Sequence, residues 1–212
     1  MKPYVIINCA SSIDGKISLV GKKSLKISNE EDMKRVHILR NECDAILVGI
    51  GTVLEDDPKL TVKEKYVKNA KQPIRIVLDS KFRVPKNAEV MKPYGKTIIA
   101  TTCKEFKRGN IEVIKCGDEK VDLKKLLKIL YNRGIRKILV EGGSTVIWEF
   151  LKNKLADELI VFYSPIIIGG KAPSIAGGEG AKSKKEIIKL QIKEIKRVGD
   201  GFLVRLSPKY EQ

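Results

Sequence analysis

The sequence has few of the residues that metal sites require. Its 212 residues include one histidine, His37, and four cysteines, Cys9, Cys43, Cys103 and Cys116, which form no Cys-x-x-Cys pair. A zinc site needs ligands grouped in sequence or several histidines, so no metal site is predicted and the cysteines are interpreted as free, buried or half-buried thiols. The missing His-x-Glu and Pro-Cys-x-x-Cys elements also exclude zinc-dependent deaminase chemistry.

Long hydrophobic runs are absent as well. The longest apolar run, Leu159–Ile168, is broken by Ser164 and Pro165, whereas a membrane-spanning helix needs about 18–20 apolar residues. The first residues show no small-residue cleavage site behind a long apolar core, so no signal peptide is predicted. We therefore expect a cytoplasmic protein with no membrane partner.

Aromatic residues are scarce, at 6%, while the formal net charge is +16, from 42 basic and 26 acidic residues. This charge favours anionic partners, either nucleic acid or phosphorylated small molecules. Nucleic-acid binders more often combine a basic stripe with stacking aromatic residues, and here the lysines are spread along the chain. We expect a lysine-rich solvated surface, a small phosphorylated substrate and no nucleic acid; the nucleic-acid alternative rests on net charge alone.

Apolar runs alternate with helical patterns along the chain, and this alternation favours a parallel sheet. The predicted strands cover Tyr4–Ala10, Ala45–Val48, Ile74–Leu78, Thr97–Ala100, Ile111–Ile114, Lys137–Val140 and Leu159–Tyr163, and Lys189–Val198 with Phe202–Leu206 form a terminal hairpin. The predicted helices begin at a Ser28-x-x-Glu31 capping box, at Asp122 and at Thr145. We predict one α/β domain over residues 1–212, with a mixed, mostly parallel sheet flanked by helices and a C-terminal antiparallel hairpin.

Two turns that follow predicted strands are rich in glycine, Gly49-Ile50-Gly51-Thr52 and Glu141-Gly142-Gly143-Ser144-Thr145. Glycine lets a phosphate approach the backbone, and the N-terminus of the next helix offers free N–H groups. Neither turn has the third glycine of the Rossmann fingerprint, and no Gly-x-x-x-x-Gly-Lys-[Ser/Thr] loop exists. A single turn of this kind is often only structural, but two at the carboxyl ends of strands favour a phosphate-bearing ligand.

Charged residues follow two of the predicted strands. Asp56 and Asp57 lie beyond the first glycine turn, where they either accept hydrogen bonds from ribose hydroxyls or an amino-substituted ring, or only complement a short helix. Ser80, Lys81 and Arg83 follow the strand Ile74–Leu78. That arrangement is expected to distinguish NADP from NAD through a 2′-phosphate, or else it is a basic surface loop.

Four stretches in this order and spacing resemble the reductase domain of the riboflavin-pathway deaminase–reductases: "NCASSIDGKIS", "DAILVGIGTVLEDDPKLTVK", "VLDSKFRVP" and "ILVEGGSTVIWEFL". The resemblance covers nearly the whole chain and implies a fold similar to that of dihydrofolate reductase. Because the deaminase half is missing, the chain is most similar to the stand-alone type. The resemblance implies an NADPH-dependent homodimer (some relatives accept NADH) acting on a ribosylamino pyrimidinone 5′-phosphate.

The resemblance also implies roles for particular residues. Cofactor contacts are implied for Gly49, Gly51, Thr52, Asp56, Ser80, Lys81, Arg83, Gly142, Gly143, Ser144 and Thr145. Substrate-side contacts are implied for Asn8, Ser12, Asp14, Ser24, Arg40, Leu60 and Lys63, the first three near the nicotinamide. Lys63 stands where relatives commonly have Arg, which replaces a bidentate fork by a point charge. Asn8 stands where bacterial bifunctional relatives tend to have Lys.

The implied reaction reduces the ribosyl group to a ribityl group by hydride addition to C1′ of the ring-opened imine. Opening the ring requires a proton, for which Asp57 and Glu141 are the titratable candidates and bound water is an alternative. His37 is interpreted as a structural residue. A dihydrofolate reductase, or a reductase that prefers the deaminated pyrimidine, are the alternatives that share this fold.

Overall fold

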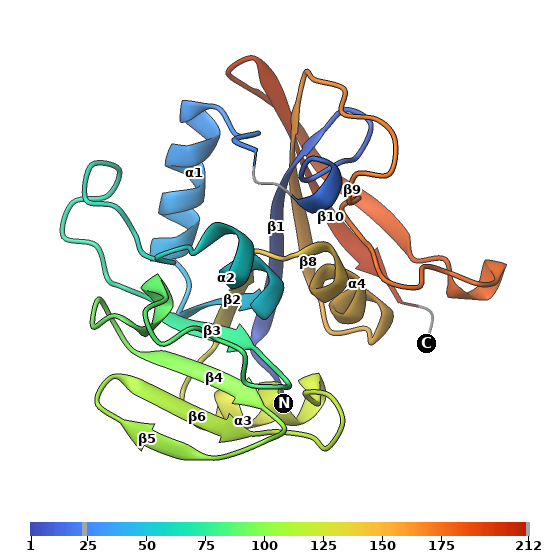
Figure 1. The fold of residues 1–212 in the computed structure, drawn as a ribbon. Coiled ribbons are helices and arrows are strands. Elements are labelled where there is room, and N and C mark those ends of the chain that lie inside the picture. The colour runs from blue at the N-terminus through green and yellow to red at the C-terminus, as the bar shows by residue number, and fades with distance from the viewer. Residues whose placement is uncertain (23–24, 211–212) are drawn as a thin grey trace. The chain divides into compact units, whose positions relative to one another are not determined.

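The computed structural model describes residues 1–22 and 25–210, which divide into two units (Figure 1). The first unit comprises Met1–Tyr4 and His37–Leu139, and the second comprises Val5–Val36 and Val140–Gln212. The expectation of one reductase domain over residues 1–212 stays a prediction.

The first unit contains strands in the order β5-β6-β4-β3-β2-β7 (Figure 1), which are mostly buried and rich in β-branched residues except for the exposed β5. Its strands are β2 (Ala45–Gly49), β3 (Ile74–Leu78), β4 (Thr97–Thr101), β5 (Phe106–Arg108), β6 (Ile111–Lys115) and β7 (Lys137–Val140). The pairs β2–β3, β3–β4 and β4–β6 are parallel, and the short β5 pairs antiparallel to β6. Every residue of β2 and β4 is buried, which is typical of a parallel sheet covered on both faces.

The strand register brings the carboxyl ends of three strands to one edge. Gly49 at the end of β2 lies opposite Leu78 of β3, and Leu78 lies opposite Ala100 of β4. The turn after β2 and the loops after β3 and β4 therefore begin side by side. In open α/β sheets this is the edge at which ligands bind.

The helices of the first unit are α2 (Ile50–Asp56), α3 (Leu123–Asn132) and the short 3-10 turn η2 (Glu89–Met91). The predicted Asp122 cap of α3 is confirmed, because its carboxylate accepts the Lys125 N–H at 3.0 Å. Leu126, Leu127 and Leu130, at helical spacing on α3, are fully buried and form its core face. Over residues 1–22 and 25–210, no helix is long and apolar enough to cross a membrane.

The second unit contains the order β1-β8-β10-β9 and the helix α4 (Ser144–Lys152). Strand β1 (Tyr4–Ser12) pairs parallel to β8 (Glu158–Ser164), while β10 (Gly201–Lys209) pairs antiparallel to β8 and to β9 (Lys189–Val198). The short 3-10 turns η1 (Val20–Lys22) and η3 (Lys184–Glu186) lie in its loops. The predicted mixed, mostly parallel architecture with a C-terminal antiparallel hairpin is confirmed.

Helix α1 (Glu30–Asn41) starts one residue later than a Ser28 capping box requires. Asn29 is the capping residue, since its side-chain oxygen accepts the Asp32 N–H at 2.8 Å. Ser28 instead donates its hydroxyl to the Asp32 carboxylate at 2.6 Å, and Glu31 accepts the Gly199 N–H at 2.9 Å. The predicted capping box is wrong because asparagine caps a helix as well as serine does and stands nearer the helix.

The four cysteines are free thiols, as expected, but they are not all shielded. Cys43 and Cys116 are buried and Cys9 is half-buried, whereas Cys103 is exposed. The expectation of a buried or half-buried thiol is therefore wrong for Cys103, which follows the end of β4 in an open loop. Among the described residues, no three or more His, Cys, Asp or Glu side chains form a group that would hold a metal ion.

Candidate active site

The first glycine turn joins β2 to α2 in the first unit. Gly49 is the N-cap of α2 in an extended conformation, and glycine has no side chain to accept the first N–H groups of the helix. A Cβ atom added at Gly51 would have no heavy atom within 4 Å, so this residue faces open space. Thr52 is half-buried and Asp56 is exposed. The predicted cofactor residues of this turn thus border open space at the carboxyl edge of the sheet.

Asp57 ends helix α2 in a left-handed conformation, with φ 39°. Its N–H donates to the Val53 carbonyl at 3.1 Å, and its carboxylate accepts the N–H of Glu89, the first residue of η2, at 2.7 Å. The residue is exposed. One oxygen of this candidate acid is therefore oriented by a backbone group, and the side chain stays accessible to a ligand.

Two side chains of α1, His37 and Arg40, contact the short segment 61–63. The Arg40 guanidinium donates to the Thr61 carbonyl at 3.0 Å, and the Lys63 N–H donates to Nδ1 of His37 at 3.1 Å. Since Nδ1 accepts a hydrogen bond, His37 is the neutral tautomer protonated at Nε2. Leu60 precedes the segment 61–63 at φ 51°, with its side chain buried. His37, fully buried, holds the Lys63 backbone in place, in agreement with its predicted structural role.

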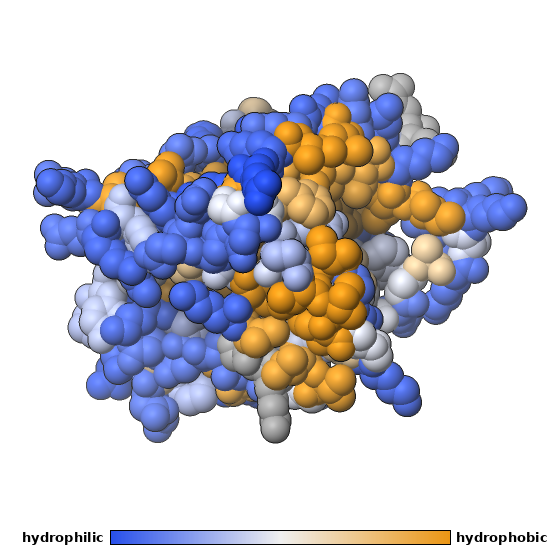
Figure 2. Space-filling model, turned by 90° about the horizontal axis from the view of Figure 1, so that it is seen from above, coloured by the Kyte–Doolittle hydropathy of each residue, from blue (hydrophilic) through white to orange (hydrophobic). Residues whose placement is uncertain are grey.

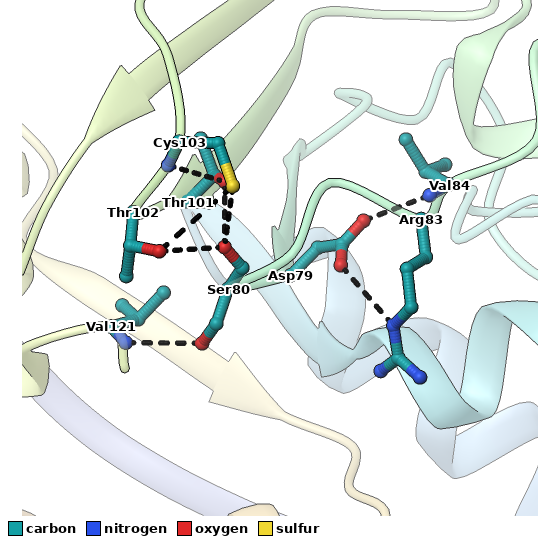
Figure 3. Close-up of polar contacts among 8 residues, drawn as sticks. All are labelled: Asp79, Ser80, Arg83, Val84, Thr101, Thr102, Cys103 and Val121. Atoms are coloured by element: carbon teal, nitrogen blue, oxygen red, sulfur yellow. Dashed lines mark hydrogen bonds and ion pairs between the residues drawn. The ribbon is translucent and has the colours of Figure 1, made fainter. Parts of the chain in front are cut away.

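The basic loop after β3 is held by its own polar groups (Figure 3). The fully buried Asp79 accepts the Val84 N–H at 2.8 Å and lies 3.9 Å from Nε of Arg83. The Ser80 hydroxyl accepts the Val121 N–H at 3.1 Å, which leaves its own hydrogen available to a phosphate oxygen. Lys81 and Arg83 are exposed. The loop is thus rigidly anchored while its two cations face solvent.

The second glycine turn joins β7 to α4 in the second unit. Glu141 is half-buried, Gly142 has φ 100°, and the Gly142–Gly143 peptide is cis. Gly143 is the N-cap of α4 and has no side chain to accept the first N–H groups. The Ser144 carbonyl accepts the Gly177 N–H at 3.1 Å, so a later loop lies against the first turn of α4, and Thr145 beside it is exposed.

Asn8, on β1, belongs to a buried polar network. Its side-chain oxygen accepts a hydrogen bond from Nη2 of Arg35 at 2.8 Å, and the same nitrogen lies 2.7 Å from the buried Asp32 carboxylate. The amide orientation of Asn8 is therefore fixed, with its oxygen toward Arg35. Burial raises the pKa of the neighbouring Cys9 thiol to about 12, so this thiol is neutral at physiological pH.

Ser12 and Asp14 tie two loops of the second unit together. The buried Ser12 hydroxyl donates to Asp14 at 2.6 Å, and Asp14 also accepts the N–H groups of Ile168 at 3.1 Å and Gly169 at 2.7 Å. These hydrogen bonds, that from Ser12 foremost, lower the pKa of Asp14 to about 2. Because the folded-state pKa is depressed, their stabilisation is present above the ordinary aspartate pKa of about 4 and is lost as the pH falls through about 2. Ser24 lies outside the described residues.

The residues of each unit, taken by itself, fit phosphate groups of a dinucleotide. In the second unit, α4 begins at a glycine whose lack of a side chain leaves N–H groups to other acceptors. In the first unit, α2 begins in the same way, and open space surrounds Gly51. Two exposed cations follow β3 at the same sheet edge as Gly49. Helix N–H groups and cations are the partners that phosphate oxygens require.

Comparison with known proteins identifies the family. Residues 3–204 match the model of the RibD C-terminal domain. This chain belongs to the RibD C-terminal domain family. A protein of Archaeoglobus fulgidus named 2,5-diamino-6-ribosylamino-4(3H)-pyrimidinone 5′-phosphate reductase is 43% identical, with 96% of this chain and 97% of that protein aligned. A protein of the same name from Methanothermobacter thermautotrophicus is 40% identical, with 99% and 100% covered.

Solved RibD structures share the fold. A diaminohydroxyphosphoribosylaminopyrimidine deaminase/5-amino-6-(5-phosphoribosylamino)uracil reductase from Thermotoga maritima aligns with a TM-score of 0.81 and 30% identity. The alignment covers 98% of this chain but only 57% of that structure, so this chain spans little more than half of it. The riboflavin biosynthesis reductase Rib7 of Saccharomyces aligns with a TM-score of 0.76 at 23% identity, covering 98% and 90% of the two chains.

Three residues of this RibD-type chain were not predicted from the sequence. Glu89 orients Asp57 through its backbone N–H, a contact that no side-chain pattern reveals. Arg35 orients Asn8, and its spacing of three residues from Asp32 on one helix was a signal for their ion pair. Gly177 lies so close to Ser144 that an added Cβ would be 2.7 Å from its hydroxyl oxygen, and the Gly177-Gly178 pair was the available signal.

Proposed function

We propose that this chain is the reductase that converts 2,5-diamino-6-ribosylamino-4(3H)-pyrimidinone 5′-phosphate to its ribitylamino product in riboflavin biosynthesis. One observation carries the proposal: two proteins with that name are 43% and 40% identical over at least 96% of this chain. The site residues are compatible with it, since two glycine turns, a basic loop and two accessible acids are the parts that such a reaction needs.

Each group has a defined task in this reaction. A bound reduced nicotinamide supplies the hydride that reduces C1′ of the ring-opened substrate. Arg40 and Lys63 bind the 5′-phosphate, and His37 keeps the Lys63 backbone in place. Asp57 delivers or orients the proton needed to open the ribose ring, because it is accessible and its carboxylate is held by the Glu89 N–H. Glu141 is the second titratable group of the site.

NADPH is the proposed cofactor. The turns Gly49–Thr52 and Gly142–Thr145 each offer backbone N–H groups to cofactor phosphate oxygens. Ser80, Lys81 and Arg83 bind its 2′-phosphate, since their loop leaves two exposed cations and one hydroxyl hydrogen available. Asn8, Ser12 and Asp14 lie at the nicotinamide end, where the Asp14 carboxylate keeps its loop in place.

The proposed function is tested by following the absorbance of NADPH at about 340 nm, the band of the reduced nicotinamide. The purified protein is given NADPH with either the diamino substrate or its deaminated counterpart. We expect turnover with the diamino substrate at a higher kcat/KM. Preference for the deaminated pyrimidine would instead assign the reaction in the name of the Thermotoga maritima structure, and no turnover with either substrate would refute the proposal.

The proposed partners are small molecules rather than macromolecules, and the proposed location is the cytoplasm. The net charge of +16 draws phosphorylated ligands toward the protein by long-range attraction. We propose neither a nucleic acid nor a membrane as a partner. Tight, steeply salt-dependent binding of a random oligonucleotide at moderate ionic strength would contradict this part of the proposal.

A homodimer is the proposed assembly, and β9 is its proposed contact. Large apolar side chains remain at the protein surface (Figure 2), and on β9 both Ile192 and Ile195 are about 60% exposed. Ile192 pairs with Leu206 and Ile195 with Val204 across a register shift, so both isoleucines share one face of the sheet. Strand β9 is the edge strand of the second unit. A second copy of this chain would cover this face.

We expect light scattering to give the mass of a dimer for the native protein. Changing both Ile192 and Ile195 to Lys places two charges in the proposed contact and should give a monomer. Ile38→Lys, at an exposed apolar position on α1, is the matched control and should stay dimeric. A monomeric native protein, or a double variant that is still dimeric, would refute the contact.

A further inference from the structure

Two loops of the first unit open from neighbouring strand ends. The loop after β3 contains Lys81 and Arg83, and the loop after β4 contains Lys104. Leu78 pairs with Ala100 and the Asp79 N–H donates to the Ala100 carbonyl at 2.9 Å. The Ser80 carbonyl then accepts the Thr102 hydroxyl at 2.9 Å (Figure 3), so the two loops are fastened together where they leave the sheet.

The Phe82 ring fixes the position of Lys104, the third cation on these two loops. Nζ of Lys104 lies 3.7 Å from the centre of the Phe82 ring, and Phe106 packs edge-on against Phe82 with ring centres 5.9 Å apart. Phe82 itself adopts φ 50°, a conformation that costs a bulky residue about 1 kcal/mol or more and persists where its surroundings or its function require it. Lys104 therefore has a defined position beside the loop that contains Lys81 and Arg83.

A buried acid restrains Arg83. Asp79 is fully buried, one of its oxygens accepts the Val84 N–H, and the other has no hydrogen-bond partner within the described residues. That second oxygen faces Nε of Arg83 at 3.9 Å, and the terminal nitrogens of Arg83 extend away from it (Figure 3). The carboxylate thus biases the guanidinium so that its outer edge stays available for an anion.

We infer that Lys104 is a third cation of the site that binds the cofactor 2′-phosphate, and that Asp79 positions Arg83 within it. This inference rests on the proposed function only for the identity of the cofactor. Three cations on two fastened loops match a dianionic phosphate monoester better than a ribose hydroxyl, which a carboxylate would bind. The site therefore selects phosphorylated over unphosphorylated dinucleotides.

Calorimetric binding of two cofactor fragments tests this without any substrate. Adenosine 2′,5′-bisphosphate carries the 2′-phosphate and adenosine 5′-monophosphate lacks it. We expect the native protein to bind the bisphosphate at least about tenfold more tightly, and Lys104→Ala to weaken only the bisphosphate, by about three- to tenfold. Lys104→Arg should restore affinity. Lys128→Ala, which removes another exposed lysine, on α3, is the matched control and should change neither affinity.

Asp79→Asn keeps an acceptor for the Val84 N–H but loses the charge that faces Arg83, so it should also weaken the bisphosphate selectively. Arg83→Gln removes the cation that Asp79 positions. Because Arg83 is exposed, this variant tests the same ion pair without a change in the protein core. Equal weakening of both fragments, or a Lys104→Ala effect no larger than that of Lys128→Ala, would overturn the inference. If the bisphosphate preference depends on Lys104 but no turnover occurs, the reductase assignment fails and the inference stands. If turnover occurs without a preference for the 2′-phosphate, the inference fails and the reductase assignment stands.

Discussion

Replacing Asp57 by Asn should lower kcat by about 10²- to 10⁴-fold, the range that loss of a general acid or base produces. The KM for the pyrimidine substrate should change much less, because Asn keeps the size and hydrogen-bonding capacity of the side chain. A steady-state comparison of kcat and KM for the native protein and the variant measures this. The expectation follows from the position of Asp57, which is accessible and oriented by the Glu89 N–H at 2.7 Å.

Asparagine suits this test because the fold tolerates it at position 57. Asp57 has φ 39°, and Asn is, with Asp, among the few residues other than Gly that often adopt a left-handed conformation. The Asn oxygen can still accept the Glu89 N–H, so a loss of activity would report on the missing proton or charge. Asp56→Asn is the neighbouring control: it should raise the KM for NADPH and leave kcat within a few-fold. Equal kcat values for the native protein and Asp57→Asn would assign the proton to Glu141 or to water.

The sheet could be predicted from the sequence because its strands are short apolar runs with clear boundaries. The bounds predicted for β3 and β7 agree with the structure, since Pro73 precedes the first and polar residues flank both. Strand β5 was missed because all of its three residues are exposed and it has no apolar pattern. The start of α1 was misplaced because Ser28 and Asn29 are both good capping residues, and sequence does not show which of them the chain uses.

The candidate site was predictable in residue type but not in contacts. Turn glycines, acids after a strand and cations such as Arg40 are visible in a sequence, whereas the contact of Arg40 with the Thr61 carbonyl is not. What the acids accept is not visible, because the donors to Asp14 and Asp57 include backbone N–H groups of residues distant in the chain. Such contacts have no side-chain signature, and they decide which carboxylate anchors a loop and which one is presented to a ligand.

The segment that orients Asp57 depends on a buried arginine, and its removal should be the most destabilising single change in the first unit. Arg75, on β3, is 1% exposed. Its guanidinium donates to the carbonyls of Glu89 at 3.3 Å, Lys92 at 2.7 Å and Gly95 at 2.6 Å. Burial lowers the pKa of Arg75 from its ordinary value, so its buried charge carries a desolvation cost that these hydrogen bonds offset.

Arg75→Met keeps an unbranched chain on the strand but leaves three carbonyls without this donor. Each carbonyl keeps another donor: the Lys92 N–H for Glu89, and the Asn110 amide for Lys92 and Gly95. The cost is therefore the loss of three hydrogen bonds from a charged donor, about 1.5–3 kcal/mol each, and relief of the buried charge offsets part of the sum. We expect the free energy of unfolding to fall by about 3 kcal/mol, which corresponds to a decrease in Tm of about 6–12 °C for a chain of this length. Calorimetric or denaturant unfolding measures it, and Arg108→Met, at an exposed position on β5, should change the stability by no more than about 0.5 kcal/mol.

The Arg75→Met variant also tests whether the segment that contains Glu89 affects catalysis separately from stability. Arg75 binds neither substrate nor cofactor in the proposed reaction. It donates a hydrogen bond to the Glu89 carbonyl, and the Glu89 N–H in turn donates to the Asp57 carboxylate. Where Arg75→Met is still folded, kcat should therefore fall and the KM for NADPH should stay near the native value, because the cofactor turns do not use this segment. A stability loss below about 1 kcal/mol would mean that water and the remaining donors, the Asn110 amide among them, satisfy the three carbonyls as well as Arg75 does. Normal kcat in a folded but destabilised variant would mean that Asp57 keeps its orientation without Arg75.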